Sequence, residues 1–229
     1  MTAAGDPATW TDRFRSLDTR FLQRVVAVWP RCVDVLPSHP QEDAITINLV
    51  HLLRKDPGAR RLFHWLALQY EPFGFTADGT AYSKGRIDMA LLVDREHERY
   101  LAYECKRLNV VRQGRRHSLA TLYVTEGVAR FVTEQYAESL SVGCVLGYVM
   151  DGDVVTAQTK VRAAIDHHRS GIGLTTEPEQ ESSIGEVKRF LSRHLRAASG
   201  LEIEVRHALL PFDRGTSTGV RRSHRILNL

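Results

Sequence analysis

The chain has 229 residues, of which 43% are hydrophobic and 25% are charged, and its formal net charge is +4. This composition is ordinary for a folded globular protein and excludes a disordered or fibrous chain, while the mild basic excess allows a polyanionic partner without requiring one. No apolar run reaches the roughly 18 residues of a membrane-spanning helix and no secretory signal pattern is visible, so we expect a cytoplasmic protein without a membrane partner.

The first part of the chain predicts two helices. Apolar residues recur at helical spacing over residues 9–33, and Pro30 is expected to end or bend this helix. We assign the helix to an N-terminal extension, residues 1–36, that packs on the main body. Ser38 offers an N-cap ahead of Pro40, so a second helix is predicted from about Pro40 to Lys55, where an Asp-Pro-Gly sequence ends it.

A group of strands follows these helices. Residues 65–71 favour a strand, with a helix over residues 60–68 as the alternative. Residues 86–94 and 99–106 are two firmer strands, and the short polar turn between them predicts an antiparallel hairpin.

The remaining segments complete an α/β pattern. Residues 122–140 predict a helix and residues 142–150 a buried strand, so this helix should cross back over the sheet. Two more helices are predicted over residues 154–168 and 184–198, separated by a polar loop at residues 170–183, and a last strand over residues 201–210. We therefore expect one α/β domain with a core at residues 37–150, a C-terminal part at residues 151–212 and a basic tail at residues 213–229.

Three charged residues of the hairpin can form one site. Alternate side chains of a strand share a face, so Glu104 and Lys106 point the same way while Cys105 points into the hydrophobic layer behind them. Asp88 lies on the partner strand, close enough for both carboxylates to converge on one ion. Carboxylate oxygens suit Mg²⁺, with Mn²⁺ as a substitute, and Lys106 would orient or deprotonate the attacking water or offset charge on a phosphate.

Other kinds of site have no support in the sequence. Neither GxxxxGK[ST] nor GxGxxG occurs, which argues against an NTPase or a dinucleotide enzyme. The ten histidines form no HExxH motif, so zinc chemistry is not expected. The three cysteines lack CxxC spacing and are interpreted as reduced core residues: Cys32, Cys105 and Cys144.

The segments Gly85-Arg86-Ile87-Asp88 and Glu104-Cys105-Lys106 resemble the PD-(D/E)XK nuclease superfamily, over about residues 42–150. The resemblance implies a restriction-endonuclease-like core: a helix, a three-stranded antiparallel meander, a crossing helix and a further strand. The N-terminal helix and the C-terminal helices plus strand would be additions to this core.

The resemblance also implies further site residues. Glu42 on the second helix would be a third acid, although Asp43 is adjacent, and the carbonyl of Cys105 would add a metal ligand. Glu126 and Arg130 would support the site from the crossing helix. The family's usual proline before the first acid is replaced here by Ile87.

Each of these residues also has an explanation that involves no function. An acid followed by acid-x-lysine arises by chance about once in a chain of this size, and a structural salt bridge is the alternative reading of the hairpin. The helix dipole alone favours an acid at Glu42, and Glu126 with Arg130 forms an ordinary i,i+4 pair. What favours the site is that both halves of the motif lie in apolar strands, where charge is costly to bury.

A metal-dependent endonuclease hydrolysing phosphodiester bonds is the function that we expect, with DNA as substrate and anti-phage defence, restriction or repair as its setting by resemblance. Homodimers are common among relatives. The alternatives are a catalytically silent DNA-binding or scaffolding subunit, and an effector held inactive by an ATPase or sensor partner. Two basic clusters would contact nucleic acid, or would simply be solvated: Arg86, Arg107, Arg112, Arg115 and Arg116 in and after the hairpin, and Arg214, Arg221, Arg222 and Arg225 in the tail.

Overall fold

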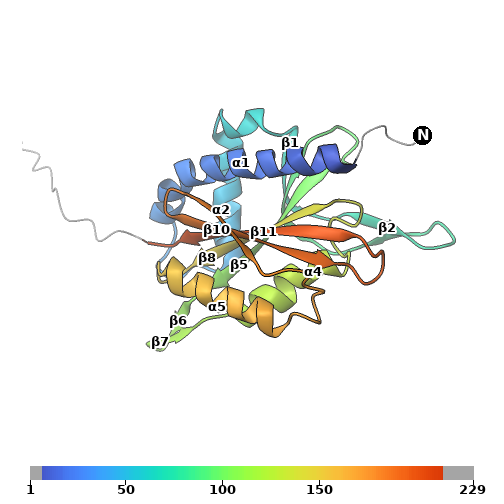
Figure 1. Cartoon of the computed structure of the whole chain (residues 1–229). Helices are drawn as coiled ribbons and strands as arrows, with labels where there is room; N and C mark the ends of the chain where they lie inside the picture. Colours follow the sequence, from blue (N-terminus) through green and yellow to red (C-terminus); the bar gives the residue numbers. More distant parts are fainter. Residues whose placement is uncertain (1–6, 214–229) are drawn as a thin grey trace, which may run out of the picture.

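A mixed seven-stranded sheet forms the middle layer of the computed structural model, which describes residues 7–213, and helices cover both of its faces (Figure 1). The basic tail therefore lies outside the described residues, apart from Asp213. The helices are α1 (Pro7–Val35), α2 (Glu42–Lys55), α3 (Ala120–Tyr123), α4 (Ala129–Val132) and α5 (Val154–His167). The sheet contains β1 (Trp65–Tyr70), β4 (Ile87–Leu92), β5 (Tyr100–Leu108), β8 (Val142–Val149), β11 (Glu202–Pro211), β10 (Val187–Leu195) and β9 (Glu179–Ile184), in that spatial order.

Strand direction divides the sheet into three parts. The first three strands form an antiparallel meander, β1-β4-β5, as predicted. In the middle, β5, β8 and β11 run parallel, which requires crossover connections: α3 and α4 supply the first and α5 lies in the second. The last three strands, β11-β10-β9, are antiparallel again. The α/β class is thus confirmed, as a mixed sheet.

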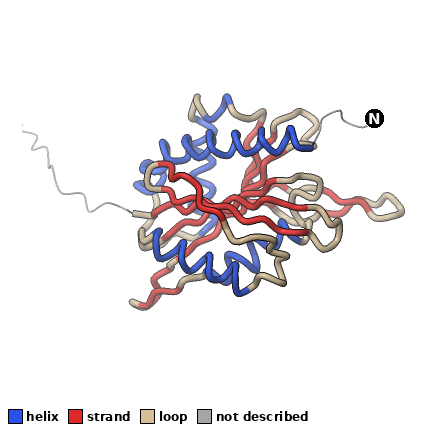
Figure 2. The backbone as a smooth tube through the Cα atoms, in the orientation of Figure 1, coloured by secondary structure: helices blue, strands red, loops and turns tan. Residues whose placement is uncertain are grey.

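Two hydrophobic layers lie on the two faces of the sheet. Figure 2 shows the helices that cover these faces. Strand alternation sends Tyr103 and Cys105 of β5 toward α1 and α2, and Ala102 and Leu108 toward α3, α4 and α5. All three cysteines are buried and free, as expected for core residues. Within the described residues, no helix is long and apolar enough to cross a membrane.

Helix α1 is fixed to the sheet by a buried ionic cluster. The carboxylate of Asp18 is 1% exposed and accepts hydrogen bonds from Arg189 (3.0 Å), Arg206 (2.8 Å) and the hydroxyl of Tyr103 (2.7 Å). These partners come from three different strands, so one carboxylate ties the helix across the width of the sheet. Pro30 does not end α1. The helix continues to Val35, because the apolar residues after the proline are buried against the rest of the fold.

Sequence patterns misjudged the C-terminal part. The predicted helix at residues 184–198 is wrong, because Val187–Leu195 form strand β10. The predicted loop at residues 170–183 contains most of edge strand β9. Polar residues of β10 are buried on both faces: Arg189 meets Asp18, and Ser192 meets histidines on the other side. A strand buried through distant polar partners lacks the simple alternation that identifies strands in a sequence.

Helix boundaries in the core also differ from the prediction. Helix α2 begins at Glu42 after Gln41, whose side chain makes no cap hydrogen bond, so Ser38 is not the N-cap. The predicted crossing helix at residues 122–140 is already complete at Val132 and contains a π-helical turn, Val124–Val128. Strand β1 is confirmed over its helical alternative. Two short hairpins were not predicted: β2 (Phe73–Phe75) with β3 (Ala81–Ser83), and β6 (Val110–Arg112) with β7 (Arg115–His117).

A chain of buried polar groups crosses the core beside these strands. Nδ1 of His194 donates to the carbonyl of Ile172 (2.8 Å), which leaves its Nε2 to accept from the hydroxyl of Ser192 (2.7 Å). That hydroxyl in turn accepts from Nε2 of His207 (2.9 Å), and Nδ1 of His207 meets the hydroxyl of Tyr123 (3.0 Å). Each polar atom in this row of hydrogen bonds has a partner only while both imidazoles are neutral.

Protonation of these histidines should destabilise the fold. Burial lowers the pKa of His194 to about 4 and that of His207 well below its usual value. Between about pH 6.5 and pH 4 the unfolded chain therefore binds more protons, so the free energy of unfolding should fall with pH by about 1.4 kcal/mol per unit for each histidine. Urea denaturation across this window measures the slope.

The variant His194→Gln should show a shallower slope, because one titrating group is removed. His167→Gln, which changes an exposed histidine of α5, is the control and should keep the wild-type slope. Equal slopes in all three proteins would contradict a role for the buried chain.

Candidate active site

The two acids of the predicted motif meet across β4 and β5. Met89 pairs with Tyr103, so the next position in this register places Asp88 opposite Glu104. Oδ2 of Asp88 accepts a hydrogen bond from the backbone N–H of Cys105 at 2.7 Å, which holds the carboxylate against the neighbouring strand. Both acids therefore occupy the end of the sheet where β4 begins and β5 approaches its last residues.

Lys106 is paired with Glu104 on the same face of β5, as strand alternation predicts. Its Nζ lies 2.6 Å from Oε1 of Glu104 and also donates to the carbonyl of Cys105 at 3.1 Å. Glu104 is 1% exposed, and its second oxygen, Oε2, has no hydrogen-bond partner. A buried carboxylate oxygen without a partner is uncommon in folded proteins, because leaving it unpaired costs about 1–3 kcal/mol or more.

A third acid reaches the site from the first turn of α2. Oε1 of Glu42 lies 3.3 Å from Nζ of Lys106, and its Oε2 accepts the backbone N–H of Arg107 at 2.8 Å. The guanidinium of Arg107 also donates to the carbonyl of Pro40 at 3.0 Å, so the start of α2 is bound to β5 at two points. The neighbouring Asp43 is exposed and does not line the site, so the fold selects Glu42 between the two acids.

The crossing segment covers the site with its π-helical turn. Gly127 lies over the pair, since a Cβ built there would be 3.6 Å from Cγ of Lys106 and 3.9 Å from Cγ of Glu104. Arg130 follows and approaches Oε1 of Glu104 at 3.5 Å. Glu126 is exposed, does not line the site and is not paired with Arg130. Because π turns are rare and concentrate at functional positions, this irregularity supports a functional role for the segment.

A cavity of about 450 Å³ lies in front of these groups, with a mostly polar lining. It is lined by Glu42, Asp88 and Glu104 together with residues that the sequence did not indicate, namely Glu71, Ser83 and Gln135. The position of Glu71, directly after β1, was a usable signal, because the end of β1 lies beside the start of β4 in a meander. Ser83 and Gln135 come from an unpredicted hairpin and from the loop after α4.

The charges of the cavity perturb one another. Burial raises the pKa of Glu104 to about 7; the nearby charge of Asp88 adds to the rise, while Lys106 and Arg130 oppose it. Burial likewise raises the pKa of Asp88, with the hydrogen bond from Cys105 opposing the rise. For Lys106 burial acts to lower the pKa, but the carboxylates of Glu104 and Glu42 outweigh it and raise the pKa, so the ammonium is strongly held.

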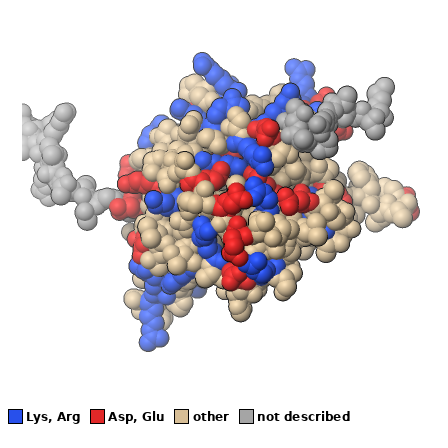
Figure 3. Space-filling model, in the orientation of Figure 1, with Lys and Arg blue, Asp and Glu red and all other residues tan. Residues whose placement is uncertain are grey.

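The basic residues of the motif region are distributed over two places. Arg86 lines the cavity, whereas Arg107 is used to fix α2. The other three lie on the β6–β7 hairpin, which forms a basic projection at the lower left of Figure 3. Arg112 and Arg115 are exposed there, while Arg116 pairs with Asp151 at 2.7 Å and Asp153 at 3.3 Å.

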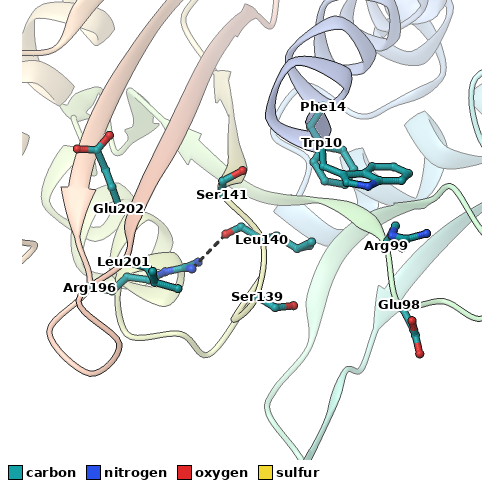
Figure 4. Close-up of a pocket in the computed structure, with 10 residues that line it drawn as sticks. All are labelled: Trp10, Phe14, Glu98, Arg99, Ser139, Leu140, Ser141, Arg196, Leu201 and Glu202. Atoms are coloured by element: carbon teal, nitrogen blue, oxygen red, sulfur yellow. Dashed lines mark hydrogen bonds between the residues drawn. The ribbon is translucent and has the colours of Figure 1, made fainter. Parts of the chain in front are cut away.

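A second cavity, of about 520 Å³, lies at the other end of the parallel strands (Figure 4). Trp10 and Phe14 of α1 form one wall, and the segments before β5, β8 and β11 form the others. Arg196 lines this cavity but is buried. Its guanidinium donates hydrogen bonds to backbone carbonyls, among them that of Leu140 at 3.1 Å. Ligands of open α/β sheets bind beyond the carboxyl ends of the strands, which is where Lys106 lies and this second cavity does not.

The oxygen atoms around Lys106 suit a divalent metal ion. Among residues 7–213, no three His, Cys, Asp or Glu side chains are grouped as a ready-made metal site. Asp88 and Glu104 nevertheless lie on adjacent strands and both line the cavity, and Oε2 of Glu104 has no hydrogen-bond partner. Mg²⁺ is normally held by one or two carboxylates together with water and phosphate oxygens, so two acids and the Cys105 carbonyl fit that ion.

Comparisons of the chain with protein-family models, with curated proteins and with solved structures find no match.

Proposed function

We propose that this protein is a metal-dependent phosphodiester hydrolase whose meander, crossing segment and β8 form a restriction-endonuclease-like core, as the resemblance to PD-(D/E)XK nucleases implies. The observation that carries the proposal is the Glu104 carboxylate. It is buried beside a second acid in the wall of a polar cavity, and one of its oxygens has no hydrogen-bond partner.

A purely structural salt bridge explains this arrangement poorly. Lys106 satisfies one oxygen of Glu104 and leaves the other unpaired, while Asp88 adds a like charge that raises the cost of ionising the pair. Buried ion pairs contribute to stability only when all of their lone pairs are matched. A divalent cation between the two carboxylates would remove both penalties.

The residues divide into ligands and charge-stabilising groups. Asp88, Glu104 and the Cys105 carbonyl would hold Mg²⁺ or Mn²⁺, which when bound supplies Lewis-acid activation of phosphate and water. Because its pKa is raised, Lys106 is suited to orient the water and stabilise charge on the phosphate as an ammonium, rather than to act as the base. Arg130 also lines the cavity, so its guanidinium can contact a phosphate there.

DNA is the expected substrate by resemblance, in restriction, repair or defence against phage. The exposed arginines of the β6–β7 hairpin favour a polyanionic substrate, since contacts of such side chains with phosphates supply affinity that is independent of nucleotide sequence. The acid pair and Lys106 favour a catalyst over a silent scaffold, which would have no need of an unpaired buried carboxylate.

Removal of either half of the site should abolish cleavage. In the presence of Mg²⁺, Asp88→Asn and Lys106→Met should each reduce the rate of plasmid or oligonucleotide cleavage by at least about 100-fold, because each removes a charge that acts on the transition state. Initial rates with plasmid, linear duplex and single-stranded DNA, with and without chelator, provide the measurement.

The matched control is Asp166→Asn, which neutralises an exposed acid on α5 and should cleave like wild type. Cleavage at equal rates by wild type, Asp88→Asn and Lys106→Met would refute the proposal.

Metal binding and catalysis should separate at Lys106. Its ammonium lies 2.6 Å from a proposed ligand, so its removal in Lys106→Met should leave Mn²⁺ binding at least as tight as in wild type while cleavage is lost. Asp88→Asn should instead weaken Mn²⁺ binding by about 10-fold or more, since a carboxylate ligand is replaced by an amide. Calorimetric titration with Mn²⁺ compares the three proteins.

Glu42→Gln and Asp43→Asn form a second pair in the same titration. Only Glu42 lines the cavity, so only its change should alter Mn²⁺ affinity. An unaltered Mn²⁺ affinity in Asp88→Asn would count against the assigned ligands.

A further inference from the structure

The β2–β3 hairpin is an arm that projects from the rim of the candidate active site, at the right of Figure 1. It is inserted between β1 and β4, so the chain enters it at Glu71 and leaves it at Gly85 and Arg86, all of which line the cavity. The arm and the cavity thus share their walls.

One face of the arm carries two exposed phenylalanines. Phe73 is 67% and Phe75 71% exposed. Phe73 pairs with Ser83 and Phe75 with Ala81, and directly opposed residues of an antiparallel pair share a face. Ser83 lines the cavity, so the aromatic face continues the cavity wall outward.

Contacts on the other face and at the tip fix the conformation of the arm. A Cβ at Gly74 would lie 2.4 Å from the ring of Tyr82, so the tyrosine lies across the glycine and occupies that face. The tip is closed by hydrogen bonds from Gly79 N to the Thr76 carbonyl (2.9 Å) and from Thr80 N to Asp78 (3.1 Å). The two phenylalanines are therefore presented to solvent by a defined hairpin.

A second arm rises from the same end of the sheet. Because β4 and β5 are antiparallel, the start of β4 and the end of β5 lie together, and the β6–β7 hairpin with exposed Arg112 and Arg115 follows β5 directly. Figure 3 shows the contrast: the β6–β7 projection is basic, while the β2–β3 projection has mostly uncharged side chains with an acidic tip. The site lies at the base of one aromatic and one basic arm.

We propose that Phe73 and Phe75 stack on unpaired bases of a nucleic-acid strand whose phosphate occupies the cavity, which makes single-stranded or locally unpaired nucleic acid the preferred substrate class. This inference rests on the proposed function. A ligand that suits both surfaces carries anionic groups for the cavity and flat apolar groups for the arm, and a nucleic-acid strand alternates the two. Base faces are hidden inside a continuous duplex, so only an unpaired strand exposes them to the rings.

A second copy of this chain fits the arm less well. Two phenylalanine side chains bury at most about 150–250 Å² each, which is well below the roughly 800 Å² per partner of a stable protein interface. Stacking on bases requires no such area, because each aromatic contact contributes separately.

The experiment measures binding without cleavage. Asp88→Asn serves as background, and fluorescence anisotropy without added metal compares single-stranded DNA, single-stranded RNA and blunt duplex DNA of one sequence. The test variant is Phe73→Ala/Phe75→Ala. The control is Trp65→Ala, which removes a 52% exposed ring at the far end of β1, where Trp65 pairs with Leu92.

The double variant should bind single strands about 10- to 100-fold more weakly, while duplex binding changes by less than about 3-fold, because stacking is lost and phosphate contacts are kept. Trp65→Ala should bind all ligands like the background. A loss confined to one of the two single strands would support the inference and identify DNA or RNA as the ligand.

In the variant Phe75→Trp, binding of a single strand should quench the fluorescence of the introduced tryptophan.

Unchanged single-strand binding in the double variant, or an equal loss for duplex, would overturn the inference. So would conversion of a dimer to a monomer by the double variant with no change in single-strand affinity, because the arm would then contact a second copy. Failure of the proposed hydrolase is distinguishable, since it appears as absent cleavage in a wild-type protein whose binding still depends on the two phenylalanines.

Discussion

The buried carboxylate of Glu104 is the constraint around which this end of the molecule is organised. Its charge lies on an inner strand of the sheet, under a helical turn and beside Asp88, where burial favours the neutral acid. Lys106 offsets this cost at one oxygen only. The fold thus maintains a partly uncompensated negative group facing a polar cavity, which is costly for stability and useful for holding a cation.

Neighbouring elements hold this arrangement rigid. The start of α2 lies beside the last residues of β5, beyond the point where β4 begins, and Glu42 and Arg107 connect α2 and β5 through hydrogen bonds. The π-helical turn brings Gly127 close to the lysine and directs Arg130 inward. On the far face, Asp18 fixes α1 to three strands. The site therefore stands on strands that are packed on both sides.

Local pattern was sufficient for the centre of the site. Alternation along β5 placed Glu104 and Lys106 on one face and Cys105 in the core, and the hairpin brought Asp88 alongside, because these relations depend on a strand period and a single turn. Glu42 was expected only through resemblance. Glu71, Ser83 and Gln135 were missed, and Glu126 was included although it faces solvent, since the π turn shifts the register of the crossing segment.

The sequence by itself determined the α/β class, the β4–β5 hairpin, β8, α5 and the acid-acid-lysine group, because each follows from side chains within one or two adjacent elements. Tertiary structure alone decided that residues 187–195 form a strand, that Glu42 rather than Asp43 meets Lys106, and that two hairpins flank the site. The physical reason is the same in each case. Buried polar groups such as Arg189, which meets Asp18, and His194, which meets the carbonyl of Ile172, are stabilised by partners far away in the chain, which a local pattern cannot contain.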